Sequence, residues 1–193
     1  PNQISSGNTY HRTQQYNFSV GNGLITSPTN TYGNFNFGEG NVIVANATEA
    51  FVALYNNNVG GNQNVVFGRN MNVRGNTNFV AATDGIVGSA ANYSALFGDA
   101  NDNYAISSLT AGFGNDNYVE SGFVMGSDNV LGALTAGTGT ANQYNYSFIL
   151  GGLQNKSTGS QNGIIGSGIT NTGASSIAIG NSFTTSTASV VSI

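Results

Sequence analysis

A repeat of 14 residues constrains this chain more than any other feature of its sequence. An apolar triplet followed by glycine and a small polar residue recurs as VVFGRN (65–70), FVMGSDN (123–129) and SSIAIGNS (175–182). Single residue types also recur every 14 positions: Asn101, Asn115 and Asn129; Gly98, Gly112 and Gly126; Tyr104 and Tyr118. Fixed periods indicate stacked units, and helical repeats need more than about 30 residues. Each unit is therefore predicted to be a coil of strand and turn.

The same period runs through the first half of the chain. Lines of 14 from residue 34 align four columns of like residues: Asn36, Asn64, Asn78 and Asn92; Phe37, Phe51, Val65, Phe79 and Tyr93; Val59, Val73 and Val87; Gly61 and Gly75. The segment NATEAFVALYN (46–56) also has a possible helix start, with Asn46 three residues before Glu49. Because it keeps the phase of its neighbours, we predict a strand there.

These features predict an all-β fold, a parallel β-solenoid of coils of about 14 residues. Val, Ile and Phe favour strands, and Gly and Asn tolerate the positive φ of tight turns. Stacked about 4.8 Å apart, about 12 coils would form a rod on the order of 55 Å long, with the Asn columns joined as amide ladders. The predicted solenoid covers 22–185, with an insertion at 131–147, an N-terminal arm or edge strand at 1–21 and a C-terminal strand at 186–193.

The predicted strands are apolar on both faces. Val65 and Phe67 point one way and Val66 the other, because neighbours on a strand alternate. A coil so short has room for few inward side chains, so a continuous apolar stripe would remain exposed, which soluble monomers avoid. Burial against identical copies, as a homotrimer or a fibre, is the simplest remedy. Cover by residues 1–33 or by the 131–147 insertion is the alternative.

The two ends of the repeat also carry strand-like sequence. QQYNFSVGNG (14–23) alternates apolar and polar residues, and ASVVSI (188–193) is rich in β-branched residues. Either end could fold over its own unpaired edge. Either could instead pair with the end of the next subunit, which would produce a head-to-tail fibre.

Composition excludes several classes of function. Only 6% of the residues are charged, the net charge is −4, and the four cations are not clustered, which argues against binding nucleic acid. There is no cysteine, so disulfides and thiolate metal sites are excluded. No apolar run approaches the 18 or so residues of a membrane helix, so we expect no direct membrane insertion. The N-terminal PNQISSGNTYHRT has no initiator Met or signal sequence, and we expect a processed chain or a fragment from outside the cell.

The phrase SSIAIGNS within a coil of about 14 residues resembles the head repeats of trimeric autotransporter adhesins, the YadA-like head. The segments that carry the resemblance are 65–70, 96–101, 123–129, 163–168 and 176–182, within the periodic frame of about 22–185. Bacteriophage tail fibres carry similar repeats. The resemblance implies a left-handed parallel β-roll, three chains packed along the rod axis, and attachment at a cell or virion surface. The repeats depart from the pattern at Tyr55-Asn56 and Ala82-Thr83, and these residues contain no heptad stalk or membrane anchor.

Few residues point to catalysis. The single histidine, His11, lies in a polar N-terminal stretch outside the repeats, and no G-x-S-x-G nucleophile motif occurs. We therefore predict that the chain is not an enzyme.

Two other kinds of site are considered. Asp99, Asp102, Asp116 and Asp128 lie in the polar segments GDANDN, GNDN and GSDN, and if the turns stack, their carboxylates could line an oxygen-rich Ca²⁺ site. Turn-forming Asp on a solvated edge is the alternative, and no other cofactor is expected. Five N-x-S/T sequons are possible glycosylation sites: Asn17, Asn46, Asn92, Asn145 and Asn155.

The leading functional hypothesis is a non-enzymatic structural or adhesive subunit of an extracellular surface fibre or filament, which assembles with itself through stacked coils and terminal strands. Its partners would be its own copies and a cell-surface or matrix receptor or glycan. The alternative is a bacteriophage tail-fibre segment on the virion surface that recognises a host glycan through residues such as Tyr104, Tyr118 and Tyr144. Ice binding is disfavoured, because Thr forms no regular column.

Overall fold

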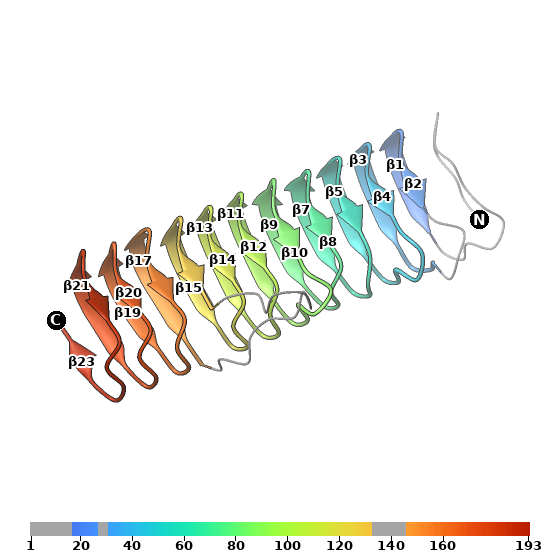
Figure 1. Cartoon of the computed structure of the whole chain (residues 1–193). Coiled ribbons are helices and arrows are strands. Elements are labelled where there is room, and N and C mark those ends of the chain that lie inside the picture. Colours follow the sequence, from blue (N-terminus) through green and yellow to red (C-terminus); the bar gives the residue numbers. More distant parts are fainter. Residues whose placement is uncertain (1–16, 27–30, 133–145) are drawn as a thin grey trace.

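The computed structural model describes residues 17–26, 31–132 and 146–193, and within them the chain is a rod of stacked coils without helices (Figure 1). Each complete coil contributes one strand to each of two parallel sheets. In the described residues the long sheet has twelve strands, β1-β3-β5-β7-β9-β11-β13-β15-β17-β19-β21-β23. The short sheet has eleven, β2-β4-β6-β8-β10-β12-β14-β16-β18-β20-β22. The predicted all-β parallel solenoid is confirmed.

The strands of the long sheet mostly have five residues. They are β1 (Phe18–Asn22), β3 (Phe35–Glu39), β5 (Phe51–Tyr55), β7 (Val65–Arg69), β9 (Phe79–Thr83), β11 (Ala95–Asp99), β13 (Leu109–Phe113), β15 (Phe123–Ser127), β17 (Phe148–Leu153), β19 (Gly163–Ser167), β21 (Ile177–Asn181) and β23 (Val191–Ser192). The strands of the short sheet have two residues each. They are β2 (Ile25–Thr26), β4 (Val42–Ile43), β6 (Asn58–Val59), β8 (Asn72–Val73), β10 (Ile86–Val87), β12 (Asp102–Asn103), β14 (Asp116–Asn117), β16 (Val130–Leu131), β18 (Lys156–Ser157), β20 (Thr170–Asn171) and β22 (Thr184–Thr185).

The 14-residue spacing sets the register of most coils. Val65 pairs with Phe79, for example, and Leu109 with Phe123. The segment around Glu49 is not a helix: Glu49 lies at a turn with φ +55°, and β5 follows it, as predicted. Other steps are longer, because Phe35 pairs with Phe51, Phe79 with Ala95, and Phe123 with Phe148.

Because of these longer steps, two of the columns predicted from the sequence, the Asn column and the Phe column, are partly wrong. Asn36 pairs with Val52 rather than aligning with Asn64, and its side chain points into the core. Asn92 aligns with Asn76, whose backbone N–H it accepts at 2.7 Å. The count of 14 fails at these two coils because each contains two additional residues, 45–46 and 89–90. The additional residues lie outside the strands, and they shift the position of every later residue in the repeat by two. Phe37 and Tyr93 leave the second column for the same reason.

Corners fall every seven residues. The corner residue has a left-handed φ in Asn56, Gln63, Asn70, Thr77 and Asp84, with values of 53°, 57°, 56°, 57° and 52°. The same spacing continues from 93 to 128 and from 154 to 189. Each coil therefore consists of two seven-residue halves. The sequence does not reveal this period, because Asn, Asp, Gln, Ser, Thr and even Tyr occupy the corners.

The core is narrow. The second residue of each strand points inward, as do Val66 and Val73, which are both fully buried. These residues form two apolar clusters, one over residues 43–96 and one over 119–178. Buried polar side chains, including Asn103 and Thr110, lie between them. Each level of the rod thus buries about one side chain from each sheet.

Ladders of asparagine line the inside of the corners. Asn115 donates its backbone N–H and its Nδ2 to Oδ1 of Asn101, both at 2.9 Å. Its own Oδ1 accepts the backbone N–H and Nδ2 of Asn129, at 3.1 and 2.9 Å. Nδ2 of Asn115 also donates to the carbonyl oxygens of Ala111 and Gly126. The predicted amide ladder is confirmed, and it satisfies corner groups that no strand partner reaches.

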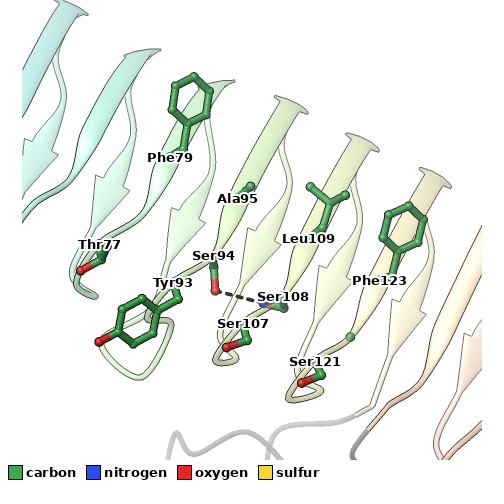
Figure 2. A pocket seen from close by; sticks show the side chains of 11 residues that line it. Thr77, Phe79, Tyr93, Ser94, Ala95, Ser107, Ser108, Leu109, Ser121 and Phe123 are labelled. Carbon is green, nitrogen blue, oxygen red and sulfur yellow. Dashed lines mark hydrogen bonds between the residues drawn. The ribbon is translucent and has the colours of Figure 1, made fainter.

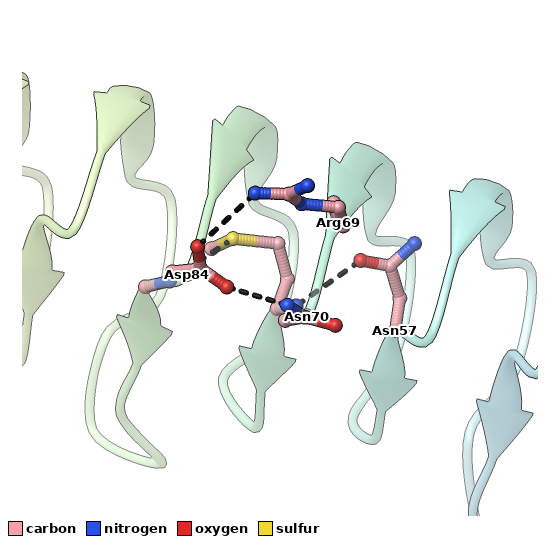
Figure 3. Close-up of polar contacts among 6 residues, drawn as sticks. Asn57, Arg69, Asn70 and Asp84 are labelled. Carbon is pink, nitrogen blue, oxygen red and sulfur yellow. Dashed lines mark hydrogen bonds and ion pairs between the residues drawn. The ribbon is translucent and has the colours of Figure 1, made fainter.

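Other side chains continue the ladder where Asn is absent. Met71 donates its backbone N–H to Oδ1 of Asn57, and its sulfur accepts the N–H of the next coil at 3.3 Å. Outside the same corner, Nη2 of Arg69 lies 3.5 Å from Oδ2 of Asp84, and Asn70 donates to Oδ1 of Asp84 at 2.6 Å (Figure 3). Such an exposed ion pair contributes roughly 0.2–1 kcal/mol, so the buried ladder is the stronger constraint.

Glycine in the recurrent phrase permits close stacking of the coils. Gly112 has a φ of +121°, and a Cβ there would collide with the carbonyl oxygen of Gly126 in the next coil. Gly98 stands in the same relation to Gly112. Glycine at the fourth position of β11 and β13 therefore lets the backbone of the next coil lie against it, whereas Leu54 and Ala82 occupy the equivalent position in β5 and β9.

The extra residues of two longer steps fall at the same corner. Residues 45–46 and 89–90 each lie between a short strand and the following long strand, so neither pair interrupts the long sheet. Residues 27–30 follow a short strand in the chain as well, and they lie outside the described residues. Of the predicted insertion at 131–147, residues 133–145 lie outside the described residues. The solenoid itself runs from β1 to β23, which includes parts of the segments predicted as an arm and a C-terminal strand.

We predict that Gly112→Ala lowers the free energy of unfolding by more than about 2 kcal/mol, because it adds a clash to an unfavourable φ. Thermal and urea denaturation followed by circular dichroism would measure the loss. Gly151→Ala is the matched control: its φ is +75°, but an added Cβ meets nothing within 4 Å. It should cost only about 1 kcal/mol. Equal losses in the two variants would contradict close stacking as the cause.

We predict that Asn115→Ala costs about 3 kcal/mol, because it leaves several buried backbone groups without partners. Asn72→Ala removes a half-buried amide whose oxygen accepts, among the described residues, only from Arg74 Nε at 3.0 Å. It should cost less than about 1 kcal/mol. The same denaturation measurements apply. If Asn115→Ala is as stable as Asn72→Ala, the amide ladder does not contribute to the stability of the stacked coils.

Candidate functional site: the apolar face of the long sheet

The outward side chains of the long sheet form a continuous apolar surface. The first and third residues of each long strand point away from the core: in β7, Val66 is fully buried while Phe67 is 41% exposed. We call these residues the apolar face. They are Phe18, Val20, Phe35, Phe37, Phe51, Ala53, Val65, Phe67, Phe79, Ala81, Ala95, Phe97, Leu109, Ala111, Phe123, Met125, Phe148, Leu150, Gly163, Ile165, Ile177, Ile179 and Val191, with Ile193 after β23.

Phenylalanine rings connect the first six coils along this face. The rings alternate between the two columns, with centroids 5.7 Å apart for Phe18–Phe37, 5.4 Å for Phe37–Phe51, 5.2 Å for Phe51–Phe67, 6.3 Å for Phe67–Phe79 and 5.7 Å for Phe79–Phe97. All of these pairs are tilted, a favourable arrangement. Alanine is the other outward residue in β5, β9 and β11, so large and small side chains alternate.

The face is exposed along the whole rod. Phe35, Phe79 and Met125 are 48%, 42% and 43% exposed. With twelve strands about 4.8 Å apart, the face covers on the order of 600 Å², at the upper limit of what soluble monomers expose, and such patches mark interaction sites. The two-faced strand predicted at 65–67 is confirmed. Of the suggested covers, β1 belongs to the sheet itself, and residues 1–16, 27–30 and 133–145 lie outside the described residues.

The outer side of the short sheet carries a different cluster. Asp102 of β12 pairs with Asp116 of β14, and the rings of Tyr104 and Tyr118 stack beside them with centroids 5.0 Å apart and planes 11° apart. The Tyr104 hydroxyl donates to Oδ2 of Asp102 at 3.1 Å, and Oδ1 of Asp102 accepts the backbone N–H of Ile86 at 2.9 Å. The sequence signal for this cluster is the tripeptide DNY, repeated 14 residues apart.

Partial burial disfavours the charged forms in this cluster. Desolvation raises the pKa of Asp102 and, together with the neighbouring Asp102 charge, the pKa of Asp116. Desolvation and the carboxylates also raise the pKa of Tyr118 to about 12, and the pKa of Tyr104 is raised by the same causes. The two tyrosines therefore stay neutral hydrogen-bond donors at physiological pH.

The four Asp considered for calcium are divided by the structure. Asp102 and Asp116 are neighbours in the short sheet, whereas Asp99 is the last residue of β11 and Asp128 is the exposed corner residue after β15. Within the described residues, no three His, Cys, Asp or Glu side chains gather into a group that could hold a metal ion. The structure thus brings two of the four candidates together.

The sequons differ in accessibility. Asn155 is buried in the ladder, where its Nδ2 donates to the carbonyl oxygens of Gly151 and Gly166, so the folded coil leaves no room for a glycan there. Asn46 is exposed at a corner, and Asn17 and Asn92 are half-buried. Asn145 and His11 lie outside the described residues.

A scan against models of known protein families and a search of curated proteins found no match to this chain. The described part of the chain contains no helix with the length and apolar character needed to cross a membrane.

We predict that Asp116→Asn raises the melting temperature at pH 7. The raised pKa means that the folded state binds more protons than the unfolded state between pH 3.8 and the folded pKa. The stability that this group contributes is full below pH 3.8 and is lost as pH rises through the folded pKa. The variant, which mimics the protonated form, should therefore exceed the wild type at neutral pH and lose that advantage towards pH 3.8. Melting curves from pH 3.5 to 8 would show this, and a pH-independent difference would contradict it.

Proposed function

We propose that this protein is a non-enzymatic structural subunit of an extracellular fibre and that it assembles with identical copies through the apolar face. The observation that carries the proposal is the exposed apolar face that extends over the twelve strands of the long sheet in the described part of the chain. A surface of this extent in water favours association, because each partner removes apolar area from solvent. A second copy supplies a matching surface of the same length.

The chemistry of the face suits lateral contact between rods. It carries no charged side chain, so two copies meet without the desolvation cost of buried charges. The extra residues 45–46 and 89–90 lie at one corner, between a short strand and the next long strand, so they do not interrupt the long strands. The resemblance to YadA-like heads favours three chains around a common axis, which would bury the apolar faces together.

The rod ends support growth along the axis. In the described residues the sheets end at β1 and β2 on one side and at β22 and β23 on the other, and Ile193 is 95% exposed. An end strand offers unpaired N–H and C=O groups to a further parallel strand. We propose that these edges join subunits head to tail, with attachment of the fibre to a cell-surface or matrix receptor or glycan. A glycan-recognising tail-fibre segment on a virion is the second candidate, favoured by a hydroxyl-lined hollow beside the apolar face (Figure 2).

Sedimentation velocity tests the assembly. The wild type should sediment faster than a 19.8 kDa monomer. The double variant Phe67→Glu, Phe97→Glu places charges on the apolar face, and we predict that it shifts to the monomer while retaining the β-sheet circular dichroism spectrum. Thr170→Glu introduces the same charge on the outer side of the short sheet and should leave assembly unchanged. A monomeric wild type, or a double variant that sediments like the wild type, would contradict the proposal.

A further inference from the structure

An open hollow of about 480 Å³ lies at one corner of the rod, beside the apolar face (Figure 2). Phe79 and Phe123 stand at its two ends, three coils apart, with Ala95 and Leu109 between them on the same side of the strands. Its volume lies within the range of roughly 300–1,000 Å³ typical of small-molecule sites.

The hollow exists because one large side chain is missing from the first-position column. That position holds Phe in β9 and β15 but Ala95 in β11. A similar gap occurs at Gly163, but there the ring of Phe148 leans over the glycine, which is buried as a result. Nothing in the described part of the chain fills the gap at Ala95 in this way.

Hydroxyl groups line the corner side of the hollow. Tyr93, Ser107 and Ser121 occupy corner positions of successive coils, so their side chains repeat about every 4.8 Å along the rod. The corner hydroxyl of Ser175 donates to Gln161 Oε1 at 3.0 Å. The hydroxyls of Tyr93, Ser107 and Ser121 instead have no partner among the described residues, and Tyr93 and Ser107 are exposed to solvent. The hydroxyls of Ser94 and Ser108, by contrast, are buried and bond inward to the carbonyl oxygen of Ala105. A row of hydroxyls that are accessible to a ligand therefore lies beside an apolar wall.

The lining identifies the chemical class of ligand. None of the lining residues is Asp, Glu, Lys, Arg or His, so the hollow offers no counter-charge to an ionic ligand. The apolar wall of Phe79, Leu109 and Phe123 suits the C–H face of a ring, and free hydroxyls suit a ligand edge that both donates and accepts hydrogen bonds. A pyranose ring has both features.

We propose that this hollow binds a sugar residue of an uncharged glycan. The site deepens the proposed attachment role and rests on it. Phe79, Ala95, Leu109 and Phe123 also belong to the apolar face. The sugar therefore binds where a second copy does not cover this stretch of the face, and sugar binding competes with lateral association. Tyr93, Ser107 and Ser121 bind the sugar hydroxyls, while Phe79, Leu109 and Phe123 contact its carbon face.

A panel of neutral oligosaccharides built from glucose, galactose, mannose and N-acetylhexosamines, with their sialylated and sulfated counterparts, tests the proposal. It is applied to the full-length wild type and to the full-length Phe67→Glu, Phe97→Glu variant, in which the face is not covered by a second copy. Titration calorimetry then measures the affinity of the best neutral binder. Ala95→Phe restores the residue used in β9 and β15 and fills the hollow, so it should weaken binding at least about 10-fold. Tyr93→Phe, Ser107→Ala and Ser121→Ala each remove one neutral hydrogen bond and should weaken it about 2- to 10-fold.

Ala111→Phe is the matched control, because it makes the same change on the apolar face outside the hollow. It should leave sugar affinity unchanged. Three results would overturn the proposal: no neutral oligosaccharide binds, only charged members bind, or Ala95→Phe binds as the wild type does. Sedimentation of Ala95→Phe separates this site from assembly. If the wild type binds no sugar and Ala95→Phe fails to assemble, the hollow is a contact site for a second copy. If the wild type binds no sugar and Ala95→Phe assembles normally, the sugar proposal fails and the fibre proposal is unaffected.

Discussion

The hydrogen-bonded corner is the constraint on which this structure depends. A chain that turns every seven residues leaves N–H and C=O groups at each turn that no neighbouring strand can satisfy. Asparagine solves this problem, because its side chain carries a donor and an acceptor and can reach both its own coil and the next. Asn115 makes such bonds to coils on both sides. With the corners satisfied internally, a coil can close in only 14 residues.

The short coil determines what the surface must be. A circuit of 14 residues encloses room for little more than one inward side chain per strand, as Val66 and Val73 show. Strands built from Val, Ile and Phe nevertheless carry apolar residues on both sides, so the remaining side chains, such as Phe67, point outward. The short circuit that closes the coil therefore also leaves an apolar face exposed on the described coils. In the proposed assembly, identical copies cover this face, and the surface that associates is a direct product of the coil geometry.

Much of this architecture is predictable from the sequence, because periodicity is directly visible in it. The parallel stacking, the ladder at Asn101, Asn115 and Asn129, and the opposed faces of Val65 and Val66 all follow from spacing and alternation. The phase slips are not predictable by counting, since two extra residues at a corner disturb no strand and leave no compositional mark. Asn36 was misplaced for that reason: it sits in a core position where Val is usual, and among the described residues its side-chain amide has no partner.

The candidate sites were less predictable than the fold. The hollow depends on the absence of a ring at Ala95, and this becomes visible only when the column of Phe79 and Phe123 is aligned in three dimensions. The pairing of Asp102 with Asp116 could have been inferred from the repeated DNY, whereas the separate positions of Asp99 and Asp128 required the corners to be located. Outward-facing residues vary independently from coil to coil, so the 14-residue period does not predict them.

The central claim is that the apolar face is buried between copies of the chain. Small-angle X-ray scattering of the native protein tests it most directly, because the radius of gyration of the cross-section reports lateral packing independently of rod length. The account predicts a cross-section clearly wider than that calculated for a single rod, whether the particles are short or long. A cross-section equal to that of one chain would contradict it, since the long sheet would then face water along its whole length.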